Sequence, residues 1–231
     1  MSDAPRAAAG AILEVDALSL GPIGTNCYLV REAGSDRALV VDPGAQAADI
    51  LEVARDRRVT IEAILVTHCH WDHIGAVAEL KRETGAAVWM SSTEAPVLAD
   101  PEQFPLGGPE PIEPATVEHQ LDGGERIEVA GLAIDVLATP GHSPGHLTFL
   151  VDGVRDASGD GYDSPPVAFV GDVIFQGSVG RTDLPFADGD TLAATLELLR
   201  TRLDPATVLC SGHGGITTMQ AELASNPFLR R

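Results

Sequence analysis

Four potential metal ligands lie within six residues in the first third of the sequence. Residues 67–73 read T-H-C-H-W-D-H, which brings His68, His70, Asp72 and His73 together. Imidazole nitrogens and carboxylate oxygens suit zinc, and also iron or manganese. A catalytic metal of this kind takes three protein ligands and keeps an open position for water. Four ligands in one short loop therefore predict two metals, with His68 and His70 directed to one and Asp72 and His73 to the other.

The flanking residues predict that these ligands lie on a turn between a strand and a helix. Residues 63–66 form a short apolar run typical of a buried strand, although periodicity alone does not separate it from a helix. Residues 74–83 carry apolar side chains at helical spacing and predict a helix. Open α/β sheets place their active sites at the carboxyl ends of strands. The alternative, a histidine-rich surface loop, is disfavoured because three of the seven histidines gather here.

The remaining chain alternates strands with helices, which predicts parallel pairing with helical crossovers. The expected strands lie at residues 12–18, 25–30, 38–41, 86–90, 125–129, 132–137, 146–151, 167–170 and 207–210, and the expected helices at 47–57, 191–203 and 219–224. Residues 1–10 are expected to be a frayed start. Two segments are expected to be long loops, the proline-punctuated residues 91–120 and the Gly-, Asp- and Ser-rich residues 152–166. The first of them is a candidate rim or lid of the active site.

Composition narrows the class of protein. A chain of 231 residues with 44% hydrophobic residues can form one α/β domain with a substantial core. The formal net charge of −19 disfavours nucleic acid and anionic membranes as partners. The three cysteines, Cys27, Cys69 and Cys210, form no disulfide framework, and Cys27 is expected to be a buried apolar residue. With no signal peptide or membrane-spanning stretch recognised in the sequence, we expect a cytoplasmic protein, and its oligomeric state stays open.

The order of the motifs resembles that of the metallo-β-lactamase-fold hydrolases. The stretch at 67–73 resembles the family signature, and three later stretches resemble its other ligand loops: T-P-G-H-S-P-G-H at 139–146, F-V-G-D at 169–172 and S-G-H-G-G at 211–215. Further stretches resemble the glyoxalase II branch, especially its short bacterial members: 21–28, 41–44, 177–183 and 226–229. The resemblance covers nearly the whole chain, and the ordered set is far more specific than any one piece.

This resemblance implies a fold and a set of metal ligands. The implied fold is a single α/β domain over residues 1–231, a four-layer αββα sandwich with mixed sheets. The implied cofactors are two divalent metals, zinc before iron or manganese. The implied ligands are His68, His70 and His142 for one metal, Asp72, His73 and His213 for the other, and Asp172 between the two. A carboxylate can bridge in this way because each of its two oxygens can bind a metal.

The implied activity is the hydrolysis of a small-molecule thioester, S-acyl-glutathione or another low-molecular-weight acyl-thiol. A hydroxide between the metals would attack the carbonyl, with Asp72 orienting it as a catalytic residue. A thiolate leaving group, with a pKa of about 8.5, needs no strong general acid. Full-length glyoxalase II holds glutathione with a basic C-terminal helical region that this sequence does not match. The identity of the carrier thiol therefore stays open.

Three other functions are weighed against this one. A mononuclear-iron persulfide dioxygenase of the same fold is the alternative, but Gly214 and Gly215 follow His213, where its members often have Asp and Tyr. A metal-binding protein without activity is disfavoured because all seven ligand positions are filled. An exported β-lactamase is disfavoured because no signal peptide is recognised.

Two further residues are candidates for a supporting role. By the resemblance, Asp42 accepts a hydrogen bond from a ligand imidazole and so fixes its orientation, although a turn-forming aspartate is the alternative. His146 either contacts substrate or packs behind the ligands, and the two interpretations stay open. Arg181 and Asp183 are expected to pair with each other and to shape their glycine-rich loop.

Overall fold

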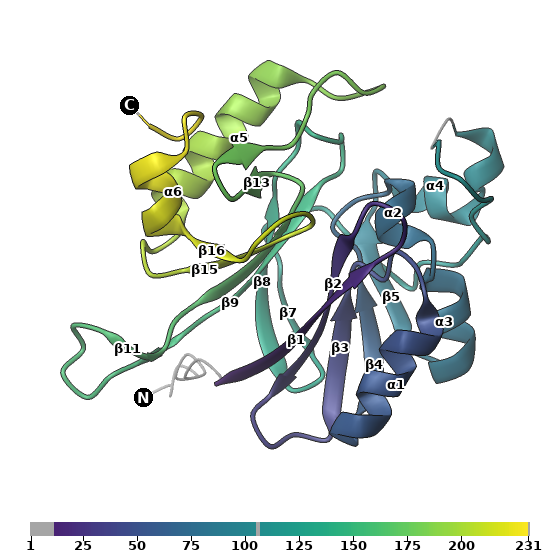
Figure 1. Ribbon diagram of the computed structural model, residues 1–231, viewed down its shortest axis with the longest axis horizontal. Coiled ribbons are helices and arrows are strands. Elements are labelled where there is room, and N and C mark those ends of the chain that lie inside the picture. Colours follow the sequence, from purple (N-terminus) through teal and green to yellow (C-terminus); the bar gives the residue numbers. More distant parts are fainter. Residues whose placement is uncertain (1–11, 105–106, 231) are drawn as a thin grey trace, which may run out of the picture.

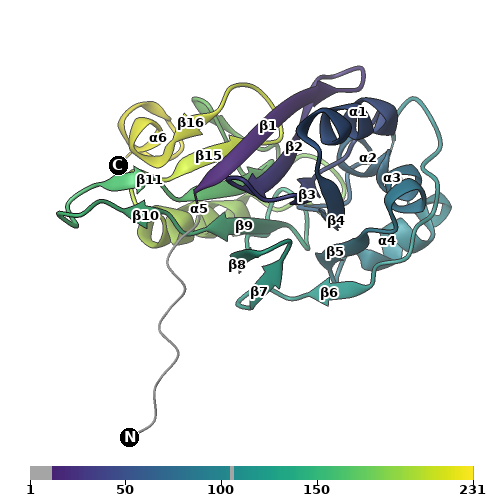
Figure 2. The same ribbon diagram turned by 90° about the horizontal axis from the view of Figure 1, so that it is seen from below.

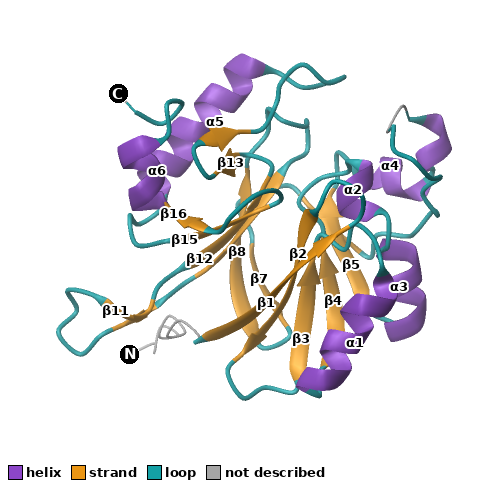
Figure 3. Ribbon diagram, in the orientation of Figure 1, coloured by secondary structure: helices purple, strands orange, loops and turns teal. Residues whose placement is uncertain are grey.

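Two six-stranded mixed sheets form the centre of the protein, and helices lie on their outer sides (Figures 1 and 3). The computed structural model describes residues 12–104 and 107–230, so the expected frayed start lies outside the described residues. The first sheet runs β1 Leu13–Leu20, β2 Thr25–Glu32, β3 Arg37–Val41, β4 Thr60–Leu65, β5 Ala87–Ser91 and β6 His119–Leu121, in that order. The second runs β16 Thr217–Thr218, β15 Val208–Ser211, β12 Val167–Gly171, β9 Leu147–Val151, β8 Leu132–Ala138 and β7 Arg126–Val129.

The helices complete a four-layer αββα sandwich. Their bounds are α1 Ala47–Arg57, α2 Trp71–Ile74, α3 Val77–Thr84, α4 Ala95–Ala99, a 3₁₀ helix at Pro101–Gln103, α5 Gly189–Arg202 and α6 Met219–Ser225. Within the described ranges, no helix is both long and apolar enough to span a membrane. The arrangement confirms the predicted fold class and mixed sheets.

Three separate clusters of buried apolar side chains correspond to the three interfaces between the layers. The first cluster joins Ile50 of α1 and Leu80 of α3 to the first sheet. The second lies between the two sheets and includes Phe149 of β9. The third joins Leu196 of α5 and Met219 of α6 to the second sheet. Each large apolar side chain buried in these clusters stabilises the fold by about 1.5–3 kcal/mol.

Side chains of the central strands alternate between two of these clusters along the strand. In β3, Ala38 and Val40 belong to the cluster under the helices, whereas Leu39 belongs to the cluster between the sheets. Successive side chains of a strand point to opposite faces. A strand covered on both faces therefore reads as a continuous apolar run, as residues 38–41 and 167–170 do.

The helix predicted over residues 74–83 is wrong in its bounds, because the structure divides it into α2 and α3. The break lies at Gly75 and Ala76, where the Pro43–Gly44 turn comes into contact. The amide of Ala76 donates to the Pro43 carbonyl at 2.9 Å, and a Cβ on Gly75 would lie 2.3 Å from the Gly44 carbonyl oxygen. A tertiary contact thus interrupts the helical pattern.

The two predicted long loops also need correction, because both contain short elements. Residues 91–120 include α4, the 3₁₀ helix and β6; Pro96 lies in the first turn of α4, where proline is tolerated. Residues 152–166 include β10 Val154–Arg155 and β11 Tyr162–Ser164, a hairpin that projects from the body of the protein (Figure 2). Helix α5 begins earlier than expected, since Asp188, and not Asp190, accepts the Thr191 amide as its N-cap.

Candidate metal centre

Seven ligand-type side chains meet where loops from both sheets come together. The N-terminal half delivers four of them on the turn from β4 into α2. The C-terminal half delivers three from separate strand ends: His142 from the β8–β9 loop, Asp172 after β12 and His213 after β15. Their ligand atoms form overlapping groups within 4.8 Å, namely His68–His70–His142, His68–His73–Asp172 and Asp72–His73–His213.

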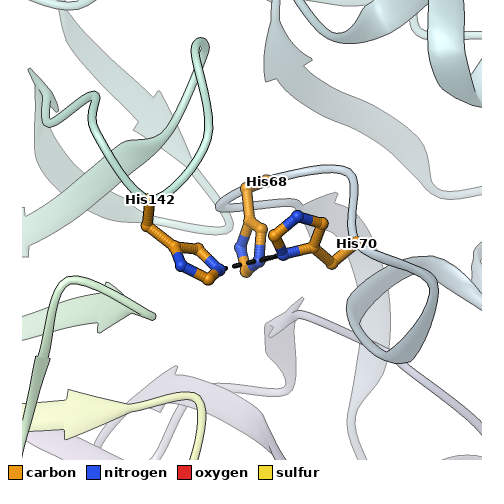
Figure 4. A group of neighbouring side chains, drawn as sticks. All are labelled: His68, His70 and His142. Carbon is orange, nitrogen blue, oxygen red and sulfur yellow. Dashed lines mark hydrogen bonds between the residues drawn. The ribbon is translucent and has the colours of Figure 1, made fainter. Parts of the chain in front are cut away.

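The first group consists of three imidazoles that direct one nitrogen each to a common point (Figure 4). The Nδ1 atom of His70 lies 2.9 Å from Nε2 of His68 and 2.9 Å from Nε2 of His142. A cation would bind all three lone pairs, whereas a single shared proton serves only two of them. The structure thus brings together the three histidines that were predicted for one metal.

The second group combines imidazoles with carboxylates. Nε2 of His213 lies 3.2 Å from Oδ2 of Asp72 and 3.4 Å from Oδ2 of Asp172. That same Asp172 oxygen lies 3.5 Å from Nε2 of His142, which belongs to the first group. The Asp172 carboxylate thus lies between the two groups.

Two unpartnered atoms test whether a cation fits. Nε2 of His73 and Oδ1 of Asp172 are buried, lie 3.3 Å apart and have no aligned hydrogen-bond partner. Buried polar atoms in proteins are nearly always paired, so an unpaired set calls for a missing ion or water. A divalent cation would satisfy both atoms, and we conclude that the donor set fits one.

A single buried carboxylate orients two of the N-terminal ligands, His68 and His73. Asp42 accepts the Thr67 amide and the Thr67 hydroxyl, each at 2.7 Å, and Nδ1–H of His73 at 3.0 Å. Because the Thr67 hydroxyl gives its proton to Asp42, it accepts from Nδ1 of His68 at 3.0 Å. Both imidazoles are thereby held in the tautomer that leaves Nε2 free to bind a metal.

Glycines permit the close approach of the supporting loops. A Cβ on Gly44 would lie 1.6 Å from the Asp72 carbonyl oxygen, and a Cβ on Gly212 would lie 2.2 Å from Oδ1 of Asp172. These positions need glycine because any side chain would occupy the space of the ligand residues.

The other supporting contacts come from the C-terminal half. Nδ1–H of His142 donates to the Arg181 carbonyl at 2.8 Å, while the Arg181 side chain pairs with Asp183 as expected. His146 is buried and accepts the Asp172 amide at 3.2 Å, which leaves its Nδ1–H to donate to Thr139. His146 therefore lies behind the ligands, on the side away from the pocket.

Burial and neighbouring charges shift the pKa values of the cluster strongly. Burial and the adjacent imidazoles lower the pKa of His68 well below its usual value. Burial opposes a charge on His73 as well, but Asp172 and Asp42 outweigh it and raise the pKa of His73 well above normal. His213 is less buried, and Asp172 raises its pKa to about 9. Metal binding must displace such protons, so acid weakens the affinity of the centre for cations.

A pocket of about 410 Å³ opens onto the centre. His70, Asp72, His142, Asp172 and His213 line it, together with apolar side chains and Arg181. The site is therefore open to a small molecule on one side and closed by protein on the other.

Comparison with known proteins identifies the family. The family model of the Metallo-beta-lactamase superfamily matches residues 20–213. The chain belongs to this superfamily. Among curated members, the hydroxyacylglutathione hydrolase GloC of Haemophilus influenzae is 30% identical over 220 residues, covering 94% of this chain and 98% of the relative.

Solved structures of superfamily members agree closely with this fold. The crystal structure of BLEG-1 B3 metallo-beta-lactamase has a TM-score of 0.80 and 34% identity, covering 94% of this chain and 99% of that one. The crystal structure of TTHA1623 in a di-iron-bound form has a TM-score of 0.76 and 36% identity, covering 93% and 100%.

Sequence reasoning missed three supporting residues of this superfamily member. Thr67 is the first residue of the signature at 67–73, and Thr25 lies in the motif at 21–28, so the sequence could have indicated both. The Thr25 hydroxyl donates to Oδ2 of Asp72 at 2.7 Å. No motif or periodic pattern in the sequence indicated a role for Glu94, because it lies in the irregular segment after β5. It is buried, and its oxygens accept the amides of Cys69 at 2.6 Å and Gly145 at 2.8 Å.

Proposed function

We propose that the protein is a binuclear metallohydrolase that cleaves thioesters of low-molecular-weight thiols. The observation that carries the proposal is the convergence of seven ligand-type side chains, five of which line one pocket and several of which are oriented by buried partners. The similarity to GloC over almost the full length of both chains supports a thioester as the substrate class. In the reaction, water adds to the acyl carbon, the carbon–sulfur bond breaks, and a carboxylic acid and a thiol are released.

The metals would be held as the two groups indicate. His68, His70 and His142 would hold one metal, Asp72, His73 and His213 the other, and Asp172 would contact both. Divalent cations there supply Lewis acidity toward the carbonyl and lower the pKa of water from about 15.7 to about 7. Zinc suits this His and Asp set, and iron or manganese are accepted by the same ligands.

The protein's own groups position the reactants. The Asp72 carboxylate lines the pocket and accepts a hydrogen bond from Thr25, which fixes its orientation. We propose that it accepts a hydrogen bond from the attacking water. The buried Asp42 and His146 hold the ligands and the Asp172 backbone from behind and keep bulk water from that side. No group need protonate the leaving sulfur, because a thiolate with a pKa of about 8.5 leaves as the anion.

We propose a small-molecule substrate and a reaction in the cytoplasm; the sparse, unpaired cysteines support this location. All three are buried free thiols. Nucleic acid is not an expected partner of a chain with a net charge of −19.

A β-lactam is the second candidate substrate, because the chain is 34% identical to the BLEG-1 metallo-β-lactamase. An amide leaving group is far more basic than a thiolate and calls for protonation. Side-by-side rates on a β-lactam and a thioester therefore separate the two classes.

The test combines metal analysis with a substrate panel. The protein, loaded in turn with zinc, iron and manganese, is offered acyl-glutathione, acyl-cysteine and acyl-coenzyme A thioesters, a chromogenic β-lactam and glutathione persulfide. We expect two metals per chain, release of thiol from at least one thioester, and no consumption of oxygen. Oxygen uptake with a single iron would establish the dioxygenase instead. No thiol release from any thioester would refute the proposal.

A further inference from the structure

A second, apolar cavity of about 240 Å³ adjoins the metal centre. It shares His70 and Leu184 with the pocket over the candidate metal centre, so the two spaces adjoin at these residues. We call this cavity the annex. Its apolar wall is formed by Val97, Phe104, Pro144, Leu184, Pro185 and Phe186.

The polar groups of the annex are already occupied or neutral. Both oxygens of Glu94 accept backbone amides, from Cys69 and from Gly145. The Cys69 side chain is a buried free thiol. The Ser143 hydroxyl has no hydrogen-bond partner, but it is neutral and covered by protein. Among the described residues that line the annex there is no lysine or arginine.

A thiol carrier such as glutathione is the wrong occupant for such a space. Its amide and carboxylate groups would lose water and gain no partners, which is unfavourable for every polar group buried. A hydrocarbon chain has no hydrogen bonds to water to lose, and its transfer from water into an apolar cavity is favourable. Of the two ends of a thioester, the acyl end therefore fits the annex, and the carrier is left to the pocket that contains Arg181.

The mouth of the annex has an unusual residue. The Phe186 side chain is 74% exposed, and its backbone has φ +68°, a left-handed conformation that bulky residues rarely adopt. Backbone strain of this kind gathers at ligand-binding sites, where the surrounding structure maintains it. An exposed phenyl ring beside a cavity is ready to cover an apolar ligand.

We propose that the annex binds the acyl chain of the substrate and that the protein prefers thioesters of extended aliphatic acids to those of short or hydroxylated ones. The inference rests on the proposed function, because it assumes that a thioester carbonyl lies over the metal centre. It adds the substrate class: an acyl-thiol whose acyl group is a hydrocarbon chain.

The test is a chain-length series on one carrier. With straight-chain acyl-glutathione substrates from acetyl to octanoyl, kcat/KM rises roughly fourfold for each methylene until the annex is full. An independent readout is binding: the dissociation constants of the matching carboxylates, measured by calorimetry on the metal-loaded protein, fall by a similar factor per methylene.

Variants at Phe186 test whether the chain-length effect arises in the annex. Phe186→Ala lowers the gain in kcat/KM per added methylene. Phe186→Asp lowers this gain further, because a carboxylate at the mouth of the annex disfavours a hydrocarbon chain there. The matched control is Leu198→Ala, which removes an exposed apolar side chain from α5 that lines neither cavity and leaves the increment unchanged.

The outcomes separate the annex from the proposed function. If both the rate of thiol release and the affinity for carboxylates are independent of chain length, the annex does not bind the acyl chain. The proposed thioesterase activity is unaffected by that result. Chain-length-dependent carboxylate binding without cleavage of any thioester supports the annex and overturns the thioesterase. An unchanged increment in both Phe186 variants also overturns the assignment of the chain to this cavity.

Discussion

The two halves of the sandwich contribute to the metal centre in opposite ways. The N-terminal half supplies four ligand-type side chains from a single turn, within residues 68–73. The C-terminal half supplies His142, Asp172 and His213 one at a time, from strand ends far apart in the sequence. One half is organised by local chain geometry and the other by the topology of its sheet.

The support behind the ligands follows the same division. In the N-terminal half, Asp42 alone accepts three hydrogen bonds and orients both His68 and His73 through short contacts. In the C-terminal half, the support is divided: the Arg181 carbonyl holds His142, and His146 accepts the Asp172 amide. The N-terminal half should therefore be most sensitive at one supporting residue, Asp42, whereas in the C-terminal half the effects should be divided among several residues and each should be smaller.

The largest expected effect is that of Asp172→Asn. An amide has only one oxygen to offer, so the link between the two groups is lost and with it one metal. Since metal Lewis acidity is worth several kcal/mol of transition-state stabilisation, kcat/KM for the best thioester should fall by roughly a thousandfold. Metal analysis should show fewer than two metals per chain. The matched control is Asp163→Asn on the projecting hairpin, which should keep both metals; full activity in Asp172→Asn would refute the bridging role.

The next effect is that of Asp42→Asn, which tests whether one residue organises the N-terminal half. Asp42 has φ +51°, and asparagine tolerates this conformation, so the backbone can stay in place. The amide cannot accept all three hydrogen bonds, and metal affinity or activity should fall by about 10- to 100-fold.

Competition with a chelator measures the metal affinity of Asp42→Asn, and the exposed substitution Asp36→Asn serves as the control. Equal metal affinity in Asp42→Asn and Asp36→Asn would show that His68 and His73 are oriented by packing alone.

The smallest effect belongs to Glu94→Gln, which tests the contact that joins the halves. Glu94 binds the Cys69 amide of one ligand loop and the Gly145 amide of the other. Hydrogen bonds to a charged group contribute about 1.5–3 kcal/mol, and glutamine keeps one acceptor oxygen. The free energy of unfolding should fall by about 1–3 kcal/mol in urea titrations, with less than a tenfold change in kcat/KM. Glu102→Gln, an exposed substitution nearby, should leave both unchanged, and the same result in Glu94→Gln would show that the two loops meet without it.

Much of the fold could be predicted from the sequence, because its strands are buried on both faces and its helices are periodic. Residues 38–41 and 167–170 are central strands, as their apolar runs predicted, and residues 47–57 form α1 within the predicted bounds. The prediction failed where a distant segment overrides local pattern. The Pro43–Gly44 turn divides the helix predicted over residues 74–83, and no property of those residues alone reveals that turn.

By itself, the sequence determined which ligand types are present and the order of the loops that carry them, since spacing within a loop is a local property. Only the tertiary structure decided that His146 lies behind Asp172, that Glu94 joins two loops, and that an apolar annex opens beside His70. The contact between Glu94 and Gly145, for example, joins residues 51 positions apart. The geometry of such contacts depends on how two sheets pack face to face, and no local pattern in the chain encodes that packing.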